Sequence, residues 1–131
     1  MFKKNNPYEK RNEMSISVMK KYPNSVPVIV EKASASSGKV DLSKTKYMVP
    51  KTLSMGDFSR EVRKHLSTPS GAMEAIFMMA IPDNDKNGIL CINSSMMSDI
   101  YDKHSSNDGF LYFELALENT FGTERIYHSM L

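Results

Sequence analysis

Residues 20–32, Lys-Lys-Tyr-Pro-Asn-Ser-Val-Pro-Val-Ile-Val-Glu-Lys, contain the change of structure from which the fold can be predicted. Pro23 and Asn24 are typical of a helix end, because proline cannot continue the helical hydrogen bonds. The run Val26–Val30 is rich in β-branched side chains and follows turn residues, which predicts a buried strand. The sequence therefore predicts a helix that ends in a turn and leads into a strand of the core.

The segment before this turn, from Pro7 to Tyr22, predicts a helix with one apolar face. Met14, Val18 and Tyr22 are spaced four residues apart and so lie on the same side. The remainder of the surface is basic, through Lys10, Arg11, Lys20 and Lys21.

The segment after the first strand predicts a hairpin followed by a helix. Residues 33–39 are a connection rich in serine, and residues 46–49 form a second strand, which Pro50 places at a sheet edge or ends. The helix spans Ser54 to Leu66, where Ser54 and Asp57 resemble a capping box. Its buried face holds Phe58, Val62 and Leu66.

The second half of the chain predicts two more strands that frame a short helix. Residues 75–81 form a strand, the Asn-Gly pair at the end of Asp83–Gly88 indicates a hairpin turn, and residues 89–92 return. Ser95 is expected to cap a helix that reaches His104 and buries Met96, Met97 and Ile100. The last strand follows the Asp-Gly turn and covers residues 110–117.

This order of elements predicts one α+β domain of the ubiquitin-like (β-grasp) roll type. The 131 residues leave no room for a second sizeable core. One cysteine allows no intrachain disulfide, and no secretory signal or apolar run of ~20 residues is present. We therefore expect a cytoplasmic protein.

The charge is uneven along the chain. Residues 1–82 hold 14 Lys/Arg and 7 acidic residues, whereas residues 83–131 hold 3 and 8. The basic half is compatible with acidic peptides, anionic lipid or nucleic acid as partners, and equally with an ordinary solvated surface.

No catalytic, metal-binding or cofactor-binding pattern is present in the sequence. Residues 37–39, Ser-Gly-Lys, lack the upstream glycine and the trailing Ser/Thr of a phosphate loop. Cys91 has no local histidine signature and is expected to be a small buried side chain. The three histidines and the cysteine do not have metal-ligand spacing. We predict that the chain is not an enzyme and uses no metal and no cofactor.

Four blocks of sequence make the chain resemble the autophagy-related protein 8 family, which includes the GABARAP and light-chain-3 proteins. They are residues 20–32, residues 46–53 (Lys-Tyr-Met-Val-Pro-Lys-Thr-Leu), residues 108–112 (Asp-Gly-Phe-Leu-Tyr) and residues 118–122 (Glu-Asn-Thr-Phe-Gly). The resemblance covers most of residues 7–122. It implies a ubiquitin-like domain with two additional N-terminal helices, so that residues 1–24 are a helical extension, 25–122 the ubiquitin-like domain and 123–131 a propeptide-like tail.

The resemblance also implies a conjugation pathway. In the family, a cysteine protease cuts after the glycine that Gly122 matches, here the Gly122–Thr123 bond. Activating and conjugating enzymes then attach the glycine to phosphatidylethanolamine, which brings the protein to the autophagosome membrane. Glycine suits this step because its backbone, which lacks a Cβ, can pass a narrow enzyme channel.

The family's second property is the binding of cargo receptors through short aromatic-x-x-aliphatic motifs, which add a strand to the sheet edge. The edge here is residues 46–49. The first motif pocket would be formed by Val18, Pro27, Lys46, Met48 and Phe110. The second would be formed by Tyr47, Val49, Pro50, Leu53, Phe58 and Val62. Lys46 would also pair with acidic residues beside the motif, whereas the apolar members are equally compatible with ordinary core packing.

Departures from the family pattern predict an altered motif preference. Met14 replaces an acidic or polar residue beside the first pocket, Glu61 replaces an aliphatic residue at the rim of the second, and His65 takes a usually basic position. Residues 83–88 resemble an insertion. We expect less tolerance for acidic residues near the second pocket. The alternatives are an adaptor that keeps its tail and is never lipidated, a modifier attached to protein, and a nucleic-acid binder, which the absence of an aromatic platform disfavours.

Overall fold

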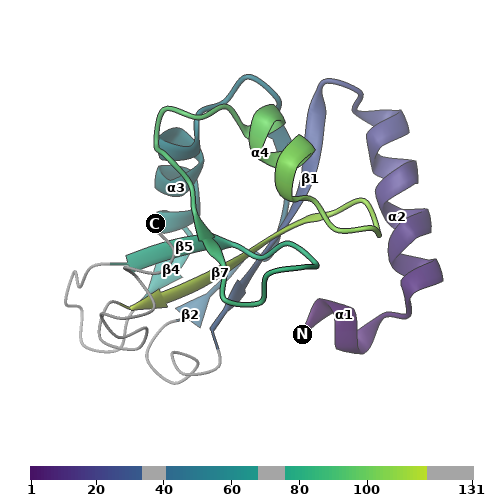
Figure 1. The fold of residues 1–131 in the computed structure, drawn as a ribbon, viewed down its shortest axis with the longest axis horizontal. Helices are drawn as coiled ribbons and strands as arrows, with labels where there is room; N and C mark the ends of the chain where they lie inside the picture. The colour runs from purple at the N-terminus through teal and green to yellow at the C-terminus, as the bar shows by residue number, and fades with distance from the viewer. Residues whose placement is uncertain (34–40, 68–75, 118–131) are drawn as a thin grey trace.

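A mixed sheet with strand order β3-β1-β7-β5-β6 forms the centre of the molecule (Figure 1). The structure is a computed structural model that describes residues 1–33, 41–67 and 76–117. β1 and β7 are parallel neighbours, and the other pairs are antiparallel. The strands are β1 (Ser25–Lys32), β3 (Lys46–Pro50), β5 (Ile76–Ala80), β6 (Ile89–Leu90) and β7 (Leu111–Leu117).

Alternation along β1 divides its side chains between the two faces of the sheet. Val26, Val28 and Val30 belong to the main core, whereas Ile29 belongs to a second cluster on the opposite face. Because successive side chains of a strand point to opposite sides, β1 is buried on both faces. This explains why its sequence is a continuous apolar run.

Helices cover both faces of the sheet. α3 (Met55–Arg63) and α4 (Met97–His104) contribute Phe58, Val62, Met97 and Ile100 to the main core, and α2 (Tyr8–Lys21) lies on the other side of β1 (Figure 1). Before α2 comes a single helical turn, α1 (Phe2–Asn5). A second, two-stranded sheet pairs β2 (Asp41–Leu42) with β4 (Leu66–Ser67).

Most of the predicted elements are confirmed. The helix over residues 7–22 is α2, and the two predicted hairpins are the antiparallel pairs of β1 with β3 and of β5 with β6. The capping box is present at α3, where the Asp57 N–H donates to Ser54 Oγ at 3.1 Å. The predicted end of this helix at Leu66 is wrong, because α3 ends at Arg63 and Leu66 pairs with Leu42 in the sheet of β2 and β4. The connection at residues 33–39 lies, apart from residue 33, outside the described residues.

The predicted start of α4 is wrong. The helix is preceded by Met96, which is extended and 43% exposed, so neither the Ser95 cap nor the burial of Met96 is found. The reason is tertiary: the Ser95 carbonyl accepts from Met55 N–H at 2.8 Å, and the Met97 N–H donates to the Leu53 carbonyl at 2.8 Å. The backbone before α4 therefore pairs with the segment before α3 instead of forming a local cap.

Candidate functional site

The edge strand β3 is the element around which the predicted site residues gather. Of the described strands, only β1 pairs with it, with Pro27 beside Met48 and Ile29 beside Lys46. Its outer edge therefore presents backbone donors and acceptors to which an extended peptide can add a strand.

The first predicted pocket lies on the α2 face of this edge. Met48 lies beside Pro27, and Phe110 precedes Leu111, which pairs with Val28, so the register brings Phe110 alongside Pro27. Pro27 and Phe110 are buried, Met48 is half-buried and Lys46 is exposed. Val18, also half-buried, comes from α2. Four of the five predicted residues therefore lie at one corner of the sheet: Pro27, Lys46, Met48 and Phe110. The exposed ammonium group of Lys46 is at the rim of this corner.

The second predicted pocket lies on the opposite face and is filled by the protein itself. Tyr47, Val49, Phe58 and Val62 belong to the main core, and the Tyr47 and Phe58 rings meet edge to face at 5.4 Å. Leu53 is half-buried and Pro50 is exposed. That a partner's side chain enters between them stays a prediction.

The charged side chain of Glu61 lies near this second set. Glu61 is exposed and lies 3.2 Å from Lys64 Nζ, so its charge is partly balanced by a neighbour on the helix. Burial, together with the charge of Glu61, raises the pKa of Tyr47 to about 12. The Tyr47 hydroxyl donates to the Lys44 carbonyl at 2.9 Å and remains protonated at neutral pH.

A buried carboxylate fixes the wall of the first pocket. Asp108 has no solvent exposure and accepts hydrogen bonds from Arg11 Nε at 2.9 Å, the Tyr112 hydroxyl at 2.5 Å and the Phe110 N–H at 2.9 Å. Its carbonyl accepts from Ser15 Oγ at 2.5 Å. These bonds tie α2 to the start of β7 and hold Phe110 in place.

Sequence reasoning missed Phe2, which packs on the same corner of the sheet. Its ring lies 5.2 Å from the ring of Phe110, and Lys46 Nζ lies 5.3 Å from its centre. Met14 is half-buried against the same cluster of Ile29, Phe110 and Tyr112. An isolated aromatic residue before two lysines carries no periodic signal that could have indicated this position.

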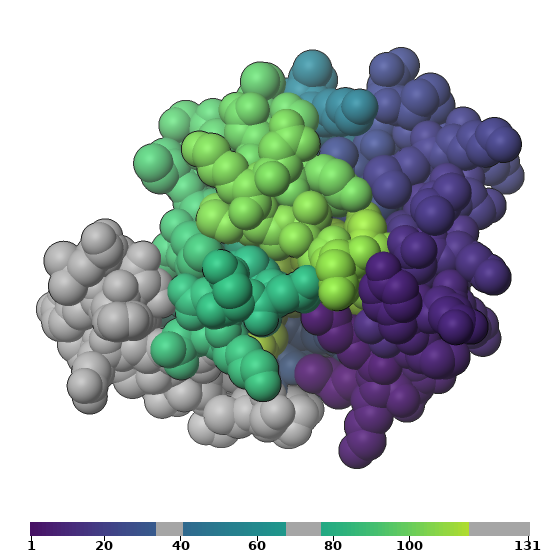
Figure 2. All heavy atoms as spheres, turned by 45° about the vertical axis from the view of Figure 1, so that its right-hand side comes forward, coloured from purple at the N-terminus to yellow at the C-terminus, as the bar shows by residue number. Residues whose placement is uncertain are grey.

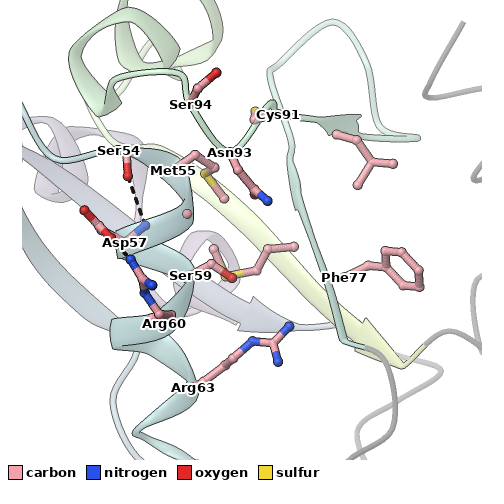
Figure 3. Close-up of a pocket in the computed structure, with 13 residues that line it drawn as sticks. Ser54, Met55, Asp57, Ser59, Arg60, Arg63, Phe77, Cys91, Asn93 and Ser94 are labelled. Carbon is pink, nitrogen blue, oxygen red and sulfur yellow. Dashed lines mark hydrogen bonds and ion pairs between the residues drawn. The ribbon is translucent and has the colours of Figure 1, made fainter.

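A separate open hollow of about 770 Å³ lies between α3, β5 and residues 90–94 (Figure 3). Arg60 and Arg63 line it from the helix, Phe77 from the sheet, and Cys91 and Asn93 from the connection. Burial raises the pKa of the Cys91 thiol to about 11, so the reactive thiolate is scarce at neutral pH. None of the residues predicted for the motif pockets lines this hollow.

Three further predictions from the sequence concern metal ions, membrane-spanning helices and the cleavage site. Within residues 1–33, 41–67 and 76–117, no group of three or more metal-ligating side chains is close enough to hold an ion. Over the same described ranges, no helix has the length and apolar character that a bilayer crossing requires. The predicted cleavage site, Gly122, lies outside the described residues.

Comparisons with known proteins agree on one family. The family model described as "Autophagy protein Atg8 ubiquitin like" matches residues 10–122. Autophagy-related protein 8b of Arabidopsis thaliana is 45% identical to this chain, covering 92% of it and 92% of the relative. Autophagy-related protein 8 of Dictyostelium discoideum is 37% identical and covers 94% of each chain.

Solved structures show the same fold. ATG8 of Trypanosoma brucei superposes with a TM-score of 0.71 at 29% identity, covering 92% of this chain and 97% of that one. Plasmodium falciparum Atg8, solved in complex with a Plasmodium falciparum Atg3 peptide, gives a TM-score of 0.73 at 23% identity, covering 88% and 94%. The ubiquitin-like α+β fold predicted from the sequence is thereby confirmed.

Proposed function

Because this chain belongs to the Atg8 family of ubiquitin-like autophagy proteins, we propose that it is a modifier processed after Gly122, conjugated to phosphatidylethanolamine, and used to recruit motif-bearing partners. In this proposal the chain is a substrate of a cysteine protease and of activating and conjugating enzymes, and is not itself an enzyme. It moves from the cytoplasm to the autophagosome membrane when it is lipidated.

The observation that carries the conjugation half is the extent of the family match, which ends at residue 122. That residue is the glycine of Glu-Asn-Thr-Phe-Gly, followed by nine further residues, Thr123 to Leu131. In this proposal a two-chain lipid supplies the membrane anchor: each buried CH₂ contributes about 0.8 kcal/mol.

The first test is the intact mass of the chain after incubation with the family's processing protease, with Gly122→Ala as the matched variant. We expect the wild type to lose residues 123–131 and the variant to stay whole. Activating and conjugating enzymes with ATP and phosphatidylethanolamine vesicles should then add the mass of one lipid. An uncut wild type would make the chain a tailed adaptor, and a mass increment of a protein would make it a protein modifier.

The observation that supports the motif-binding half is the edge position of β3 between two apolar faces. A partner strand would pair with the outer edge of β3, its aromatic side chain would meet the corner formed by Pro27, Met48 and Phe110, and its aliphatic side chain the Tyr47–Phe58 side. Lys46, exposed at the rim, would attract acidic residues that precede the motif.

The binding half is tested by titrating a fluorescent aromatic-x-x-aliphatic peptide that carries acidic residues before the motif. Lys46→Glu is expected to weaken binding about tenfold, which corresponds to about 1.4 kcal/mol. Lys86→Glu, the same charge reversal on an exposed residue of the 83–88 segment, should leave the affinity unchanged. Equal affinities for all three proteins would contradict the assigned site. Glu61→Leu, read on a peptide array, tests the expected intolerance of acidic residues near the second pocket.

A further inference from the structure

We propose that Phe2 is an internal ligand of the first motif pocket, where its ring takes the place of the partner's aromatic side chain. A motif peptide then binds only after the N-terminal turn has moved away. This inference rests on the proposed peptide binding and adds to it a competitor built into the same chain.

The ring of Phe2 contacts two of the five residues that are predicted to receive an incoming aromatic side chain. It meets the edge of Phe110 at 5.2 Å with an interplanar angle of 74°, and it lies 6.4 Å from the Tyr112 ring. Lys46 Nζ lies 5.3 Å from its centre, a cation–π distance. Phe110 and Lys46 are two of the five residues predicted to receive the partner's aromatic group, so one ring excludes the other.

Polar contacts hold the turn that carries Phe2 on this corner of the sheet. The Phe2 N–H donates to Glu31 Oε2 at 2.8 Å. Arg11 Nη1 donates to the Asn6 carbonyl at 2.7 Å and to the Lys3 carbonyl at 3.2 Å. The turn is therefore fixed to β1 through Glu31 and to α2 through Arg11.

The segment that resembles an insertion provides a further contact to this turn. Asp83 pairs with Lys3 Nζ at 3.3 Å and accepts a hydrogen bond from the Asn107 N–H at 2.8 Å. Figure 2 shows the purple N-terminal segment directly beside the teal-green segment that follows β5. Residue 83 thus connects the N-terminal turn to the loop that leads into Phe110.

The turn is nevertheless attached weakly enough to be displaced. α1 has four residues, none of them fully buried, and the ring of Phe2 is only half-buried. A helix of one turn has no stability of its own and depends on its contacts. When a competent state is only fractionally populated, the apparent affinity falls by that fraction, so an open population of about one tenth would weaken motif binding about tenfold.

The test compares the full chain with Phe2→Ala in titrations with the same fluorescent motif peptide. Removal of the ring is expected to tighten binding about tenfold. Lys4→Ala, an exposed substitution in the same turn, is the control and should leave the affinity unchanged. Asp83→Asn, which removes a tether and keeps the ring, should tighten binding by a smaller factor. Hydrogen exchange of the wild type gives a second readout, because the Asn5 and Asn6 amides, bonded within the turn, should lose protection when peptide binds.

Each outcome bears on the proposal. Tighter binding by Phe2→Ala, with loss of amide protection in the wild-type complex, supports the internal ligand. Equal or weaker binding by Phe2→Ala overturns it, since the ring would then be a neutral neighbour or a wall of the pocket. If Phe2→Ala does not fold, unchanged protection of the wild-type turn in the complex overturns it as well. Absence of peptide binding by every variant overturns the proposed motif binding, and the inference with it.

Discussion

Asp108 is a fully buried carboxylate whose partners come from two separate parts of the chain. Arg11 lies on α2, and Tyr112 and the Phe110 N–H lie at the start of β7. The side chain of Arg11 is itself only 12% exposed, so little water can solvate the remaining charge when one partner is removed. Buried ion pairs of this kind are costly to break from one side, because the remaining charge stays desolvated.

We therefore predict that Asp108→Asn lowers the free energy of unfolding by about 3 kcal/mol, as measured by urea denaturation. Asp102→Asn makes the same change on the exposed face of α4 and should alter stability by less than about 0.5 kcal/mol. If the two variants were equally stable, the Arg11 charge would have to be solvated in the folded state, contrary to the geometry.

The substitution of glycine by alanine is expected to have opposite effects on stability at Gly109 and at Gly56. Gly109 has φ +92°, and a Cβ there would lie 2.3 Å from Ser15 Oγ, the atom that bonds the Asp108 carbonyl. Gly109→Ala should cost at least about 2 kcal/mol through strain and the lost bond. Gly56 lies in α3, and its nearest contact would be 3.4 Å, to Asn93. Gly56→Ala should be neutral or stabilise by up to about 1 kcal/mol. Thermal denaturation of both proteins measures the difference, and a shared sign would contradict this account.

At the scale of elements, the sequence predicted those parts whose structure depends on local chemistry. The valines around Ile29 predicted β1, the four-residue spacing of Met14 and Val18 predicted α2, and Ser54 with Asp57 predicted the start of α3. Elements held by distant partners were missed. β2 and β4 have two residues each and exist only as a pair, and α4 begins where the backbone of Met97 meets Leu53.

The side-chain cap at the start of α3 is expected to contribute to stability. Ser54→Ala removes the acceptor of the Asp57 N–H and is expected to lower stability by about 1 kcal/mol, the usual cost of a lost cap. Ser17→Ala, on an exposed position within α2, is the matched control and should be neutral or stabilise by up to about 0.5 kcal/mol, since alanine is the better helix former. A denaturant midpoint for Ser54→Ala equal to that of the control would show that the side-chain cap contributes nothing measurable.

For the molecule as a whole, the sequence predicted which residues surround β3 but not which of them are accessible. Because the side chains of a strand alternate with a period of two, the sequence assigns Met48 to one face of the sheet and Tyr47 to the other. Burial depends on what packs from elsewhere in the chain: Phe58 and Val62 close over Tyr47, and Phe2 closes over Phe110. Phe58 and Val62 are neighbours of Tyr47 in the core of the fold. Phe2 and Phe110 are 108 positions apart in the sequence, so no local pattern can indicate their contact.

Tyr47 and Tyr112 lie on opposite faces of the sheet and make the stability of the whole molecule sensitive to alkali. Burial raises the pKa of Tyr47 to about 12 from the ordinary tyrosine value of 10.0. Burial, and then the hydrogen bond to Asp108, also raise the pKa of Tyr112. The folded state disfavours both tyrosinates, so their contribution to stability is complete below pH 10.0 and is lost as the pH rises toward the folded-state pKa.

We predict that the free energy of unfolding falls above pH 10.0, with the share of Tyr47 on the order of 1–2 kcal/mol because its hydroxyl lies near the rim. Urea midpoints measured as the pH rises above 10.0, together with tyrosinate absorbance, would show unfolding and ionisation occurring together. Tyr47→Phe cannot ionise and should flatten the dependence, although it begins from a lower stability because the hydrogen bond to the Lys44 carbonyl is lost. Since Tyr112 remains in that variant, part of the dependence should persist. If these two tyrosines titrated near pH 10.0, the ordinary tyrosine pKa, in a protein that stays folded, the burial of both hydroxyls would be contradicted.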